Sequence, residues 1–125
     1  MIQQEGPGWR LARDTSRSIF PYLIGGERWA IELTKDEWEI FFNLINDLID
    51  HHRQMADKLM PEEQIFIELE RDLWWVALDG DRKHWKLQIV LSSKYSANRG
   101  VEAEWPIPAA QAMATAMRTM WDSYH

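Results

Sequence analysis

Residues 25–38 read GGERWAIELTKDEW, and this stretch carries the chain from a sheet into a helix. Its leading glycine pair is a two-residue hairpin signal between two short apolar runs. In residues 29–33, large apolar side chains alternate with small or charged ones, which predicts a half-buried strand. Thr34 and, three residues later, Glu37 form the pattern of a capping box. A helix is therefore expected to begin directly after this strand.

The helix that follows is expected to be long. Its apolar positions recur at spacings of three, four and seven residues for about six turns, and the pattern ends at Pro61. The stripe consists of Trp38, Phe41, Phe42, Ile45, Leu48, Ile49, His52, Met55, Ala56 and Leu59. We interpret His52 as a hydrogen-bonded core or boundary residue, because no second histidine stands at the i, i+4 spacing of a zinc site.

Further strands are expected on both sides of this helix. They are predicted at Gly8–Ala12, Phe20–Ile24, Ile65–Glu70, Leu73–Leu78, Trp85–Leu91 and Val101–Trp105. Pro106 ends the last strand, and Pro108 suits the first turn of a closing helix. The order βββ-α-ββββ-α indicates an α+β protein with antiparallel sheets. We expect one domain over residues 8–125, preceded by a flexible N-terminus at residues 1–7.

The chain is rich in tryptophan and lacks cysteine, with eight tryptophans among its 125 residues. Trp74 and Trp75 are adjacent and must point to opposite faces of their strand, so we expect that strand to be covered on both sides. The absence of cysteine excludes disulfides, zinc–thiolate sites and thiol nucleophiles, which favours a cytoplasmic protein. No apolar run is long enough for a membrane span, and the first residues do not form a secretory signal.

The sequence contains no motif typical of catalysis. A phosphate loop, a dinucleotide-binding glycine motif and a serine elbow are all missing. Glu68 and Glu70 share one strand face, but acid–base chemistry needs a cleft around such a pair, and surface rows of glutamate are far commoner. We therefore predict a protein without enzymatic activity, without a cofactor and without a metal site.

The charge pattern favours a protein partner over nucleic acid. The net charge is −6, whereas nucleic-acid binding relies on basic patches. The positions predicted to point outward from the strands are Arg10, Glu32, Glu68, Glu70, Lys86, Gln88, Glu102 and Glu104, and five of these eight are glutamates. Such a face repels phosphate and suits solvent or a basic protein.

Single-stranded nucleic-acid binding remains the alternative function. The positive charges available for it lie mainly in loops. Together with one aromatic side chain for base stacking, the candidate contacts are Arg10, Arg82, Lys83, Lys86, Lys94, Tyr95 and Arg99. Solubilising charges at hairpin tips are the other interpretation of the same residues.

A second candidate surface is apolar and rich in flexible methionine side chains. Trp74 is expected to share an apolar face with Phe66, Val76 and Leu78, and the closing helix presents methionines that adapt well to a partner. The candidate dimer or partner residues are Trp74, Met113, Met117, Met120 and Trp121. We predict binding of a protein partner and a homodimeric working state, and core packing is the competing interpretation of this set.

Four short motifs carry a family resemblance over roughly residues 8–121. They are Gly8-Trp9-Arg10-Leu11, the stretch from Gly25 to Thr34 running into Glu37, Glu68-Leu69-Glu70 with Leu73-Trp74, and Gly100-Val101-Glu102 with Trp105-Pro106. Together they resemble the small cyanobacterial proteins of domain-of-unknown-function family 1818. The resemblance implies a fold similar to that of the Whirly and positive-cofactor-four type single-stranded-DNA-binding regulators. It brings no catalytic residues.

Overall fold

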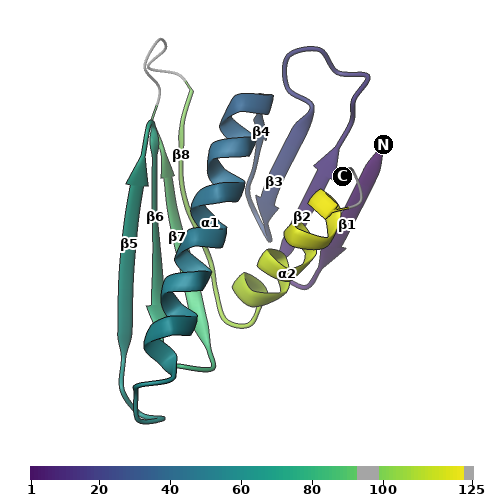
Figure 1. Ribbon diagram of the computed structural model, residues 1–125. Helices are drawn as coiled ribbons and strands as arrows, with labels where there is room; N and C mark the ends of the chain where they lie inside the picture. Colours follow the sequence, from purple (N-terminus) through teal and green to yellow (C-terminus); the bar gives the residue numbers. More distant parts are fainter. Residues whose placement is uncertain (93–98, 123–125) are drawn as a thin grey trace.

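The computed structural model describes residues 1–92 and 99–122, with side chains up to residue 120. Along the chain the elements are β1 (Ile2–Gly6), β2 (Trp9–Arg13), β3 (Tyr22–Gly26), β4 (Ala30–Leu33), α1 (Lys35–Ala56), β5 (Ile65–Arg71), β6 (Trp74–Gly80), β7 (Trp85–Leu91), β8 (Val101–Trp105) and α2 (Ala109–Asp122). Within these residues the strands form two four-stranded antiparallel sheets, β1-β2-β3-β4 and β5-β6-β7-β8 (Figure 1). The α+β class with antiparallel sheets is thus confirmed.

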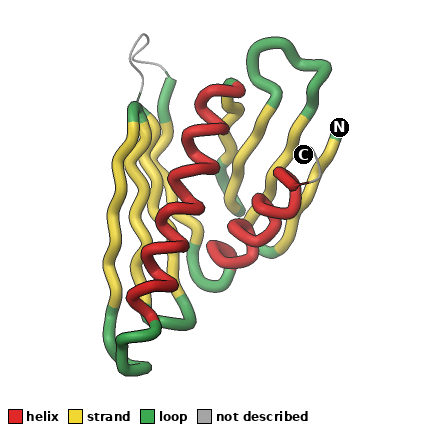
Figure 2. The backbone as a smooth tube through the Cα atoms, viewed as in Figure 1, coloured by secondary structure: helices red, strands yellow, loops and turns green. Residues whose placement is uncertain are grey.

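Each helix packs mainly against the sheet to which its own half of the chain does not belong. The first half ends in α1, which lies against β5 and β6 of the second sheet. The second half ends in α2, which lies against β1 and β2 of the first sheet and also contacts β7. Figure 2 shows the two helices on the inner side of the two sheets. Each sheet therefore has one face in the core and one face turned outward.

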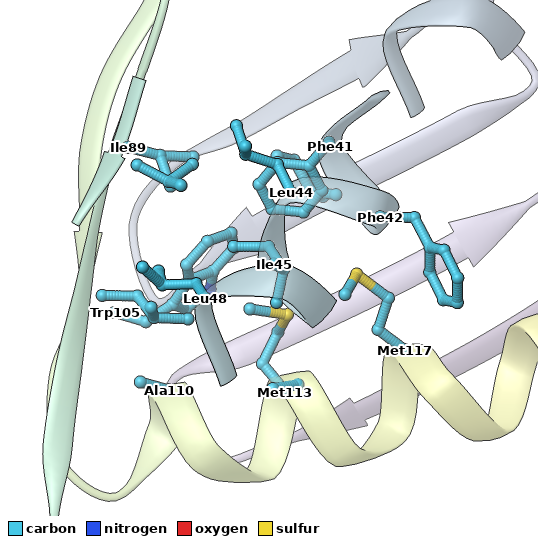
Figure 3. Packing of buried hydrophobic residues seen from close by; sticks show 14 of the residues in the cluster. Phe41, Phe42, Leu44, Ile45, Leu48, Ile89, Trp105, Ala110, Met113 and Met117 are labelled. Atoms are coloured by element: carbon cyan, nitrogen blue, oxygen red, sulfur yellow. The ribbon is translucent and has the colours of Figure 1, made fainter. Parts of the chain in front are cut away.

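The core lies where the helices meet the inner sheet faces. Phe41, Ile45 and Leu48 of α1 face Trp105 of the second sheet and Met113 of α2 in the close view (Figure 3). All five side chains have no solvent exposure. Burial of this many large apolar side chains, each contributing roughly 1.5–3 kcal/mol, is the main stabilising term.

Aromatic side chains connect α1 with both sheets and connect the two sheets with each other. Trp38 of α1 stacks on Tyr22 of β3, with 4.7 Å between ring centroids and 4° between ring planes. Phe41 of α1 lies 4.8 Å from the ring of Trp74 on β6. The buried indole N–H of Trp105 donates to the carbonyl of Gly25 across 2.9 Å. These contacts bury indole rings and still satisfy their polar atoms where a carbonyl is in reach.

The structure has one strand more than the sequence predicts before the first helix. Strand β1 occupies residues expected to be a flexible N-terminus, so the order is ββββ-α-ββββ-α. Its sequence IQQEG has a single large apolar side chain, and pairing with β2 rather than burial defines it. The signal for it is the Pro7-Gly8 pair, a turn dipeptide in which Gly8 has a φ of 80°.

The turn between β3 and β4 follows the glycine pair and does not contain it, contrary to the prediction. Gly25 and Gly26 are the last residues of β3, and the N–H of Gly26 donates to the carbonyl of Trp29 (2.9 Å). A Cβ on Gly26 would lie 2.2 Å from Nε1 of Trp29. The missing side chain at Gly26 therefore makes room for an indole ring.

Helix α1 begins where the capping box predicts and ends earlier than the apolar stripe suggests. The Thr34 hydroxyl accepts from the N–H of Glu37 (3.1 Å), and the Glu37 carboxylate accepts from the N–H of Thr34 (2.8 Å). At the other end the N–H of Lys58 donates to the carbonyl of Met55, a short turn that closes the helix. The predicted core position Met55 is 42% exposed.

His52 confirms its interpretation as a hydrogen-bonded core residue. Its side chain is buried, and Nε2 lies 2.9 Å from the carbonyl oxygen of Asp81 in the turn between β6 and β7. The imidazole ring also packs 5.9 Å from the ring of Trp85. This contact ties the end of α1 to the end of the second sheet.

Candidate functional site

The candidate site is the outer face of the second sheet, here called the acidic face. Its residues are Phe66, Glu68, Glu70, Trp75, Ala77, Asp79, Lys86, Gln88, Val90, Glu102 and Glu104. The period of two along each strand places them opposite the buried set that faces α1. In the described part of the chain both helices lie on the inner side, so no helix covers this face (Figure 1).

Strand register arranges the acidic face in rows. Glu70, Trp75, Val90 and Glu102 lie side by side on β5, β6, β7 and β8. The next row is Glu68, Ala77, Gln88 and Glu104. In these two rows glutamates stand on both edge strands, while the two central strands carry apolar, small or amide side chains. In the third row Phe66 stands on β5, and Asp79 and Lys86 face each other on the central strands. The result is a lane with an acidic rim on each side.

Trp75 is the main aromatic side chain of this lane. Its ring is half-buried, and its indole N–H donates to the carboxylate of Glu68 across 3.1 Å. A hollow of about 420 Å³ lies beside it. Its lining residues are Trp75, Gln88, Ile89, Val90, Glu102, Ala103 and Glu104. The hollow offers an indole edge and carboxylates to whatever binds there.

Part of the negative charge on this face is already balanced. The Glu104 carboxylate lies 3.4 Å from Nζ of Lys86 and accepts from the amide of Gln88 at 3.3 Å. Among the described residues, Glu68, Glu70, Asp79 and Glu102 have no ion-pair partner, and of these Glu68 accepts a hydrogen bond from Trp75. Glu70 and Glu102 lie at the two ends of the Trp75 row. These two glutamates flank Trp75 and Val90 in the same row, so the uncompensated charge is concentrated at the lane.

The outward positions predicted from alternation are largely confirmed. Glu68, Glu70, Glu102 and Glu104 are exposed as expected, and Lys86 and Gln88 are half-buried on the same face. The sequence prediction missed that Trp75 belongs with them. The alternation of side chains along the strand contains this information, because a buried Trp74 requires Trp75 to point outward.

The expectation that β6 is covered on both sides is wrong for the described chain. Trp74 is 1% exposed beneath α1, and its indole N–H donates to the carbonyl of Glu37 at 3.0 Å. Trp75 faces away from both helices. Phe66 is also on this outer face, 55% exposed, and therefore does not share a face with Trp74.

The candidate partner surface on α2 lies in the core. Met113 and Met117 have no exposure and Met120 has 1%, because α2 packs against β1, β2 and β7. Figure 3 shows Met113 and Met117 beside Ile45 and Phe42 of α1. With the buried Trp74, four of the five predicted residues are therefore not exposed for a partner. The side chain of Trp121 lies outside the described residues.

The predicted basic contacts do not come together. Arg10 lies on the outer face of the first sheet, Arg82 and Lys83 lie in the turn between β6 and β7, and Lys86 is paired on the acidic face. Arg99 is at the opposite end of the second sheet, just before β8. Lys94 and Tyr95 lie outside the described residues. The described cations are thus distributed over separate surfaces.

Arg99 connects the start of β8 with the first half of the chain. Its guanidinium donates to the carboxylate of Glu37 and to the carbonyl of Glu32, and it lies 4.6 Å over the ring of Phe20. A hollow of about 520 Å³ beside it also contains Arg17, which pairs with Glu32. Both arginines of this hollow are engaged by glutamates, which removes most of its attraction for an anion.

The turn at Arg82 and Lys83 is built by Asp81. Its carboxylate accepts from the N–H of His84 (2.7 Å) and of Lys83 (2.8 Å). These backbone hydrogen bonds, first that of His84, lower the pKa of Asp81 below the ordinary value of an aspartate. Arg82 and Lys83 of this turn are exposed to solvent.

Two further observations bear on the class of protein. Within the described residues, no helix is both long and apolar enough to cross a membrane. In the same residues, no three histidine, cysteine or acidic side chains gather in a way that would hold a metal ion.

The chain was compared with protein families and with known proteins. Residues 4–120 match the family described as "Domain of unknown function (DUF1818)". A crystal structure of a protein with unknown function from Prochlorococcus sp. NATL2A, described as belonging to the DUF155 family, is 45% identical in sequence. It superimposes with a TM-score of 0.90 over 97% of this chain and 99% of that chain. No curated protein matches.

Proposed function

The chain belongs to the DUF1818 family, and we propose that it is a non-enzymatic interaction module that binds a protein partner across its acidic face. The observation that carries this proposal is the hollow beside Trp75 on a sheet face that no helix of the described chain covers. A half-buried tryptophan in a hollow is the type of side chain that dominates the energetics of protein interfaces. The surrounding glutamates give the face a charge that selects its partner.

Charge supports a protein partner rather than a nucleic acid at this face. Phosphate groups would meet the carboxylates on both edge strands, of which Glu70 and Glu102 lack a compensating cation among the described residues. Coulomb repulsion at such a surface lowers both the affinity and the association rate of a polyanion. A partner with basic side chains gains from the same field.

The proposal is tested by site-specific photo-crosslinking in cells of the source organism. A photoreactive benzoylphenylalanine replaces Gln88 in the lane or, as a matched control, Gln3 on the outer face of the first sheet. We expect one discrete protein adduct from position 88 and none from position 3. Equal adducts from both positions, no adduct at position 88, or an adduct removed by nuclease would each contradict the proposal.

Single-stranded nucleic-acid binding is the alternative function. The specific observation in its favour is the order ββββ-α-ββββ-α with two antiparallel sheets, which is compatible with a Whirly-like layout. Titration with oligo-thymidylate and with a mixed RNA, followed by tryptophan fluorescence, separates the two functions. Micromolar binding that weakens steeply with salt would favour the nucleic-acid function. No response at low salt would favour the protein partner.

We further propose a cytoplasmic location, on the basis of the cysteine-free composition. Homodimer formation stays a prediction. A dimer would use a surface other than the predicted methionines, because Met113, Met117 and Met120 are buried within one chain. Sedimentation at several concentrations measures the oligomeric state directly.

A further inference from the structure

We propose that the occupant of the acidic face is a basic amphipathic helix of the partner protein, lying along β6 and β7 between the two glutamate rims. This inference rests on the proposed function and specifies what the partner contributes. It follows from three properties of the face: the width of the lane, the apolar side chains along its middle, and the sign of its rims.

The width of the lane matches a helix. Glu70 on β5 and Glu102 on β8 are three strands apart in one row. At about 4.8 Å per strand spacing, their backbones lie roughly 14 Å apart. An α-helix with its side chains is about 10–12 Å across. A helix therefore fits between the rims and leaves room for long side chains to reach them.

The middle of the lane is apolar at the row of Trp75 and Val90, and this is where the apolar stripe of a helix would bind. Trp75 and Val90 are half-buried neighbours on the two central strands, and the small side chain of Ala77 beside Trp75 has no solvent exposure. Phe66, 55% exposed, lies toward the far end of this face on β5. An amphipathic helix binds in this way, with residues at i, i+3, i+4 and i+7 in the groove.

The rims specify basic flanks. The rims carry four carboxylates, from Glu68 and Glu70 on β5 and from Glu102 and Glu104 on β8, while Asp79 and Lys86 face each other on the central strands. Lysine and arginine on either side of the helix's apolar stripe can lay their stems over the lane and place their charges at the rims. An acidic helix would meet repulsion on both sides, so charge selects against it.

The opposite face of the same sheet already holds a helix in this manner. Helix α1 packs its apolar stripe on the inner face of β5 and β6 (Figure 1). The partner helix would complete a layered arrangement with this sheet in the middle. A seven-residue strand spans roughly 23 Å, which corresponds to about 15 residues of helix.

The probe for this inference is a synthetic peptide of about 15 residues with a leucine stripe at helical spacing, flanked by lysine and arginine. A second peptide has the same composition in an order that removes the stripe. Affinities are measured by calorimetry on the full chain. We expect micromolar binding of the first peptide and at least about tenfold weaker binding of the second.

Variants locate the binding. Glu70→Lys with Glu102→Lys reverses the rims of the Trp75 row, and Glu5→Lys with Glu27→Lys makes the same charge change at exposed sites away from the face. We expect the first pair to weaken binding at least about tenfold and the second to change it by less than about threefold. Circular dichroism verifies that each variant is folded.

A measurement on the unaltered protein keeps the inference testable if the rim variant does not fold. In ¹H–¹⁵N spectra, the indole signal of Trp75, assigned with Trp75→Phe, should shift on peptide addition together with amides of β6 and β7. Equal binding of both peptides, equal loss in both variant pairs, or shifts confined elsewhere would overturn the inference.

The two proposals fail in different ways. A protein adduct from position 88 with no stripe-dependent peptide binding would leave the interaction module standing and overturn the helical partner. Stripe-dependent binding at Trp75 with no protein adduct from position 88 would overturn the proposed function. It would still show that the acidic face prefers a basic amphipathic helix.

Discussion

Single side chains fix the turns of this protein, and Asp81 is the best-defined case. Its carboxylate accepts two backbone hydrogen bonds from the turn between β6 and β7, and its own carbonyl meets the imidazole of His52. The N–H groups of His84 and Lys83 lower the pKa of Asp81 in the folded protein. The charged carboxylate is therefore more stable in the folded state than in the unfolded state.

This low pKa predicts a pH-dependent contribution to stability. The stabilisation by Asp81 should be fully present above about pH 4, the ordinary aspartate range, and should be lost as the pH falls through its folded pKa. Asp81→Asn keeps a side-chain acceptor and removes the charge. Melting temperatures of both proteins should differ at pH 7 and converge toward pH 2. A constant difference across this range would contradict the assignment.

At Gly26 the absence of a side chain is the structural requirement. The Trp29 indole occupies the space of a Cβ, with Nε1 2.2 Å from its ideal position. Gly26→Ala should therefore displace the ring of Trp29 from its contact with Trp105 and cost about 1–3 kcal/mol of unfolding free energy. Chemical denaturation measures this cost. Ala12→Gly, a change of the same size on the neighbouring strand β2, is the matched control and should cost about 1 kcal/mol or less.

At the scale of elements, the junction between β4 and α1 is the most constrained part of the chain. Glu37 closes the capping box with Thr34 and also receives the guanidinium of Arg99 from the segment before β8. One carboxylate thus begins a helix and anchors a distant loop. Strand β4, the N-cap residue and helix α1 follow each other without an intervening loop. A substitution that displaces one of them would therefore displace the other two.

Thr34→Ala tests the cap. It removes the hydroxyl that accepts from the N–H of Glu37 and should lower the unfolding free energy by about 1 kcal/mol. Thr34→Ser retains an acceptor and should cost much less. Urea denaturation followed by far-ultraviolet circular dichroism distinguishes these values. Equal losses for both substitutions would show that the methyl group, rather than the hydrogen bond, is responsible.

The elements that could be predicted from the sequence are those with strong periodicity or a cap. Helix α1 was identified from the stripe and from Thr34, and β7 from the strict alternation of Trp85–Leu91. Strand β1 was missed because its five residues have little apolar contrast and depend on pairing with β2. Alternation also identified the glutamates of the acidic face and placed Trp74 and Trp75 on opposite faces, and the register with β5 and β7 shows that Trp75 lies between Glu70 and Val90 on this face.

At the scale of the whole molecule, contacts between residues far apart in sequence decide which side chains are exposed and which are buried. The predicted basic set is scattered, since Arg82 and Arg99 lie before and after β7 and therefore at opposite ends of one sheet. The predicted methionine surface became core because α2 returns to the first sheet. The burial of the methionines depends on which sheet α2 covers, and single-sequence periodicity does not contain this information.

Strand β1 provides a test of the whole-molecule arrangement. Alternate amides of residues 2–6 should exchange with solvent at least about tenfold more slowly than in an unstructured peptide, because they donate to β2. Hydrogen exchange by nuclear magnetic resonance measures this protection, and the exposed residues 18 and 19 are the internal reference. Exchange at the peptide rate throughout residues 2–6 would show that the first sheet has three stable strands.

The exchange of helices between the two halves has a consequence for how the chain folds. Residues 1–62 contain the first sheet without α2, and the remaining residues contain the second sheet without α1, so either fragment alone leaves most of one sheet face in water. The native contacts join residues far apart in sequence, which favours slow, all-or-none folding. Cut within the loop between α1 and β5, the chain should give two disordered fragments that regain structure only when mixed.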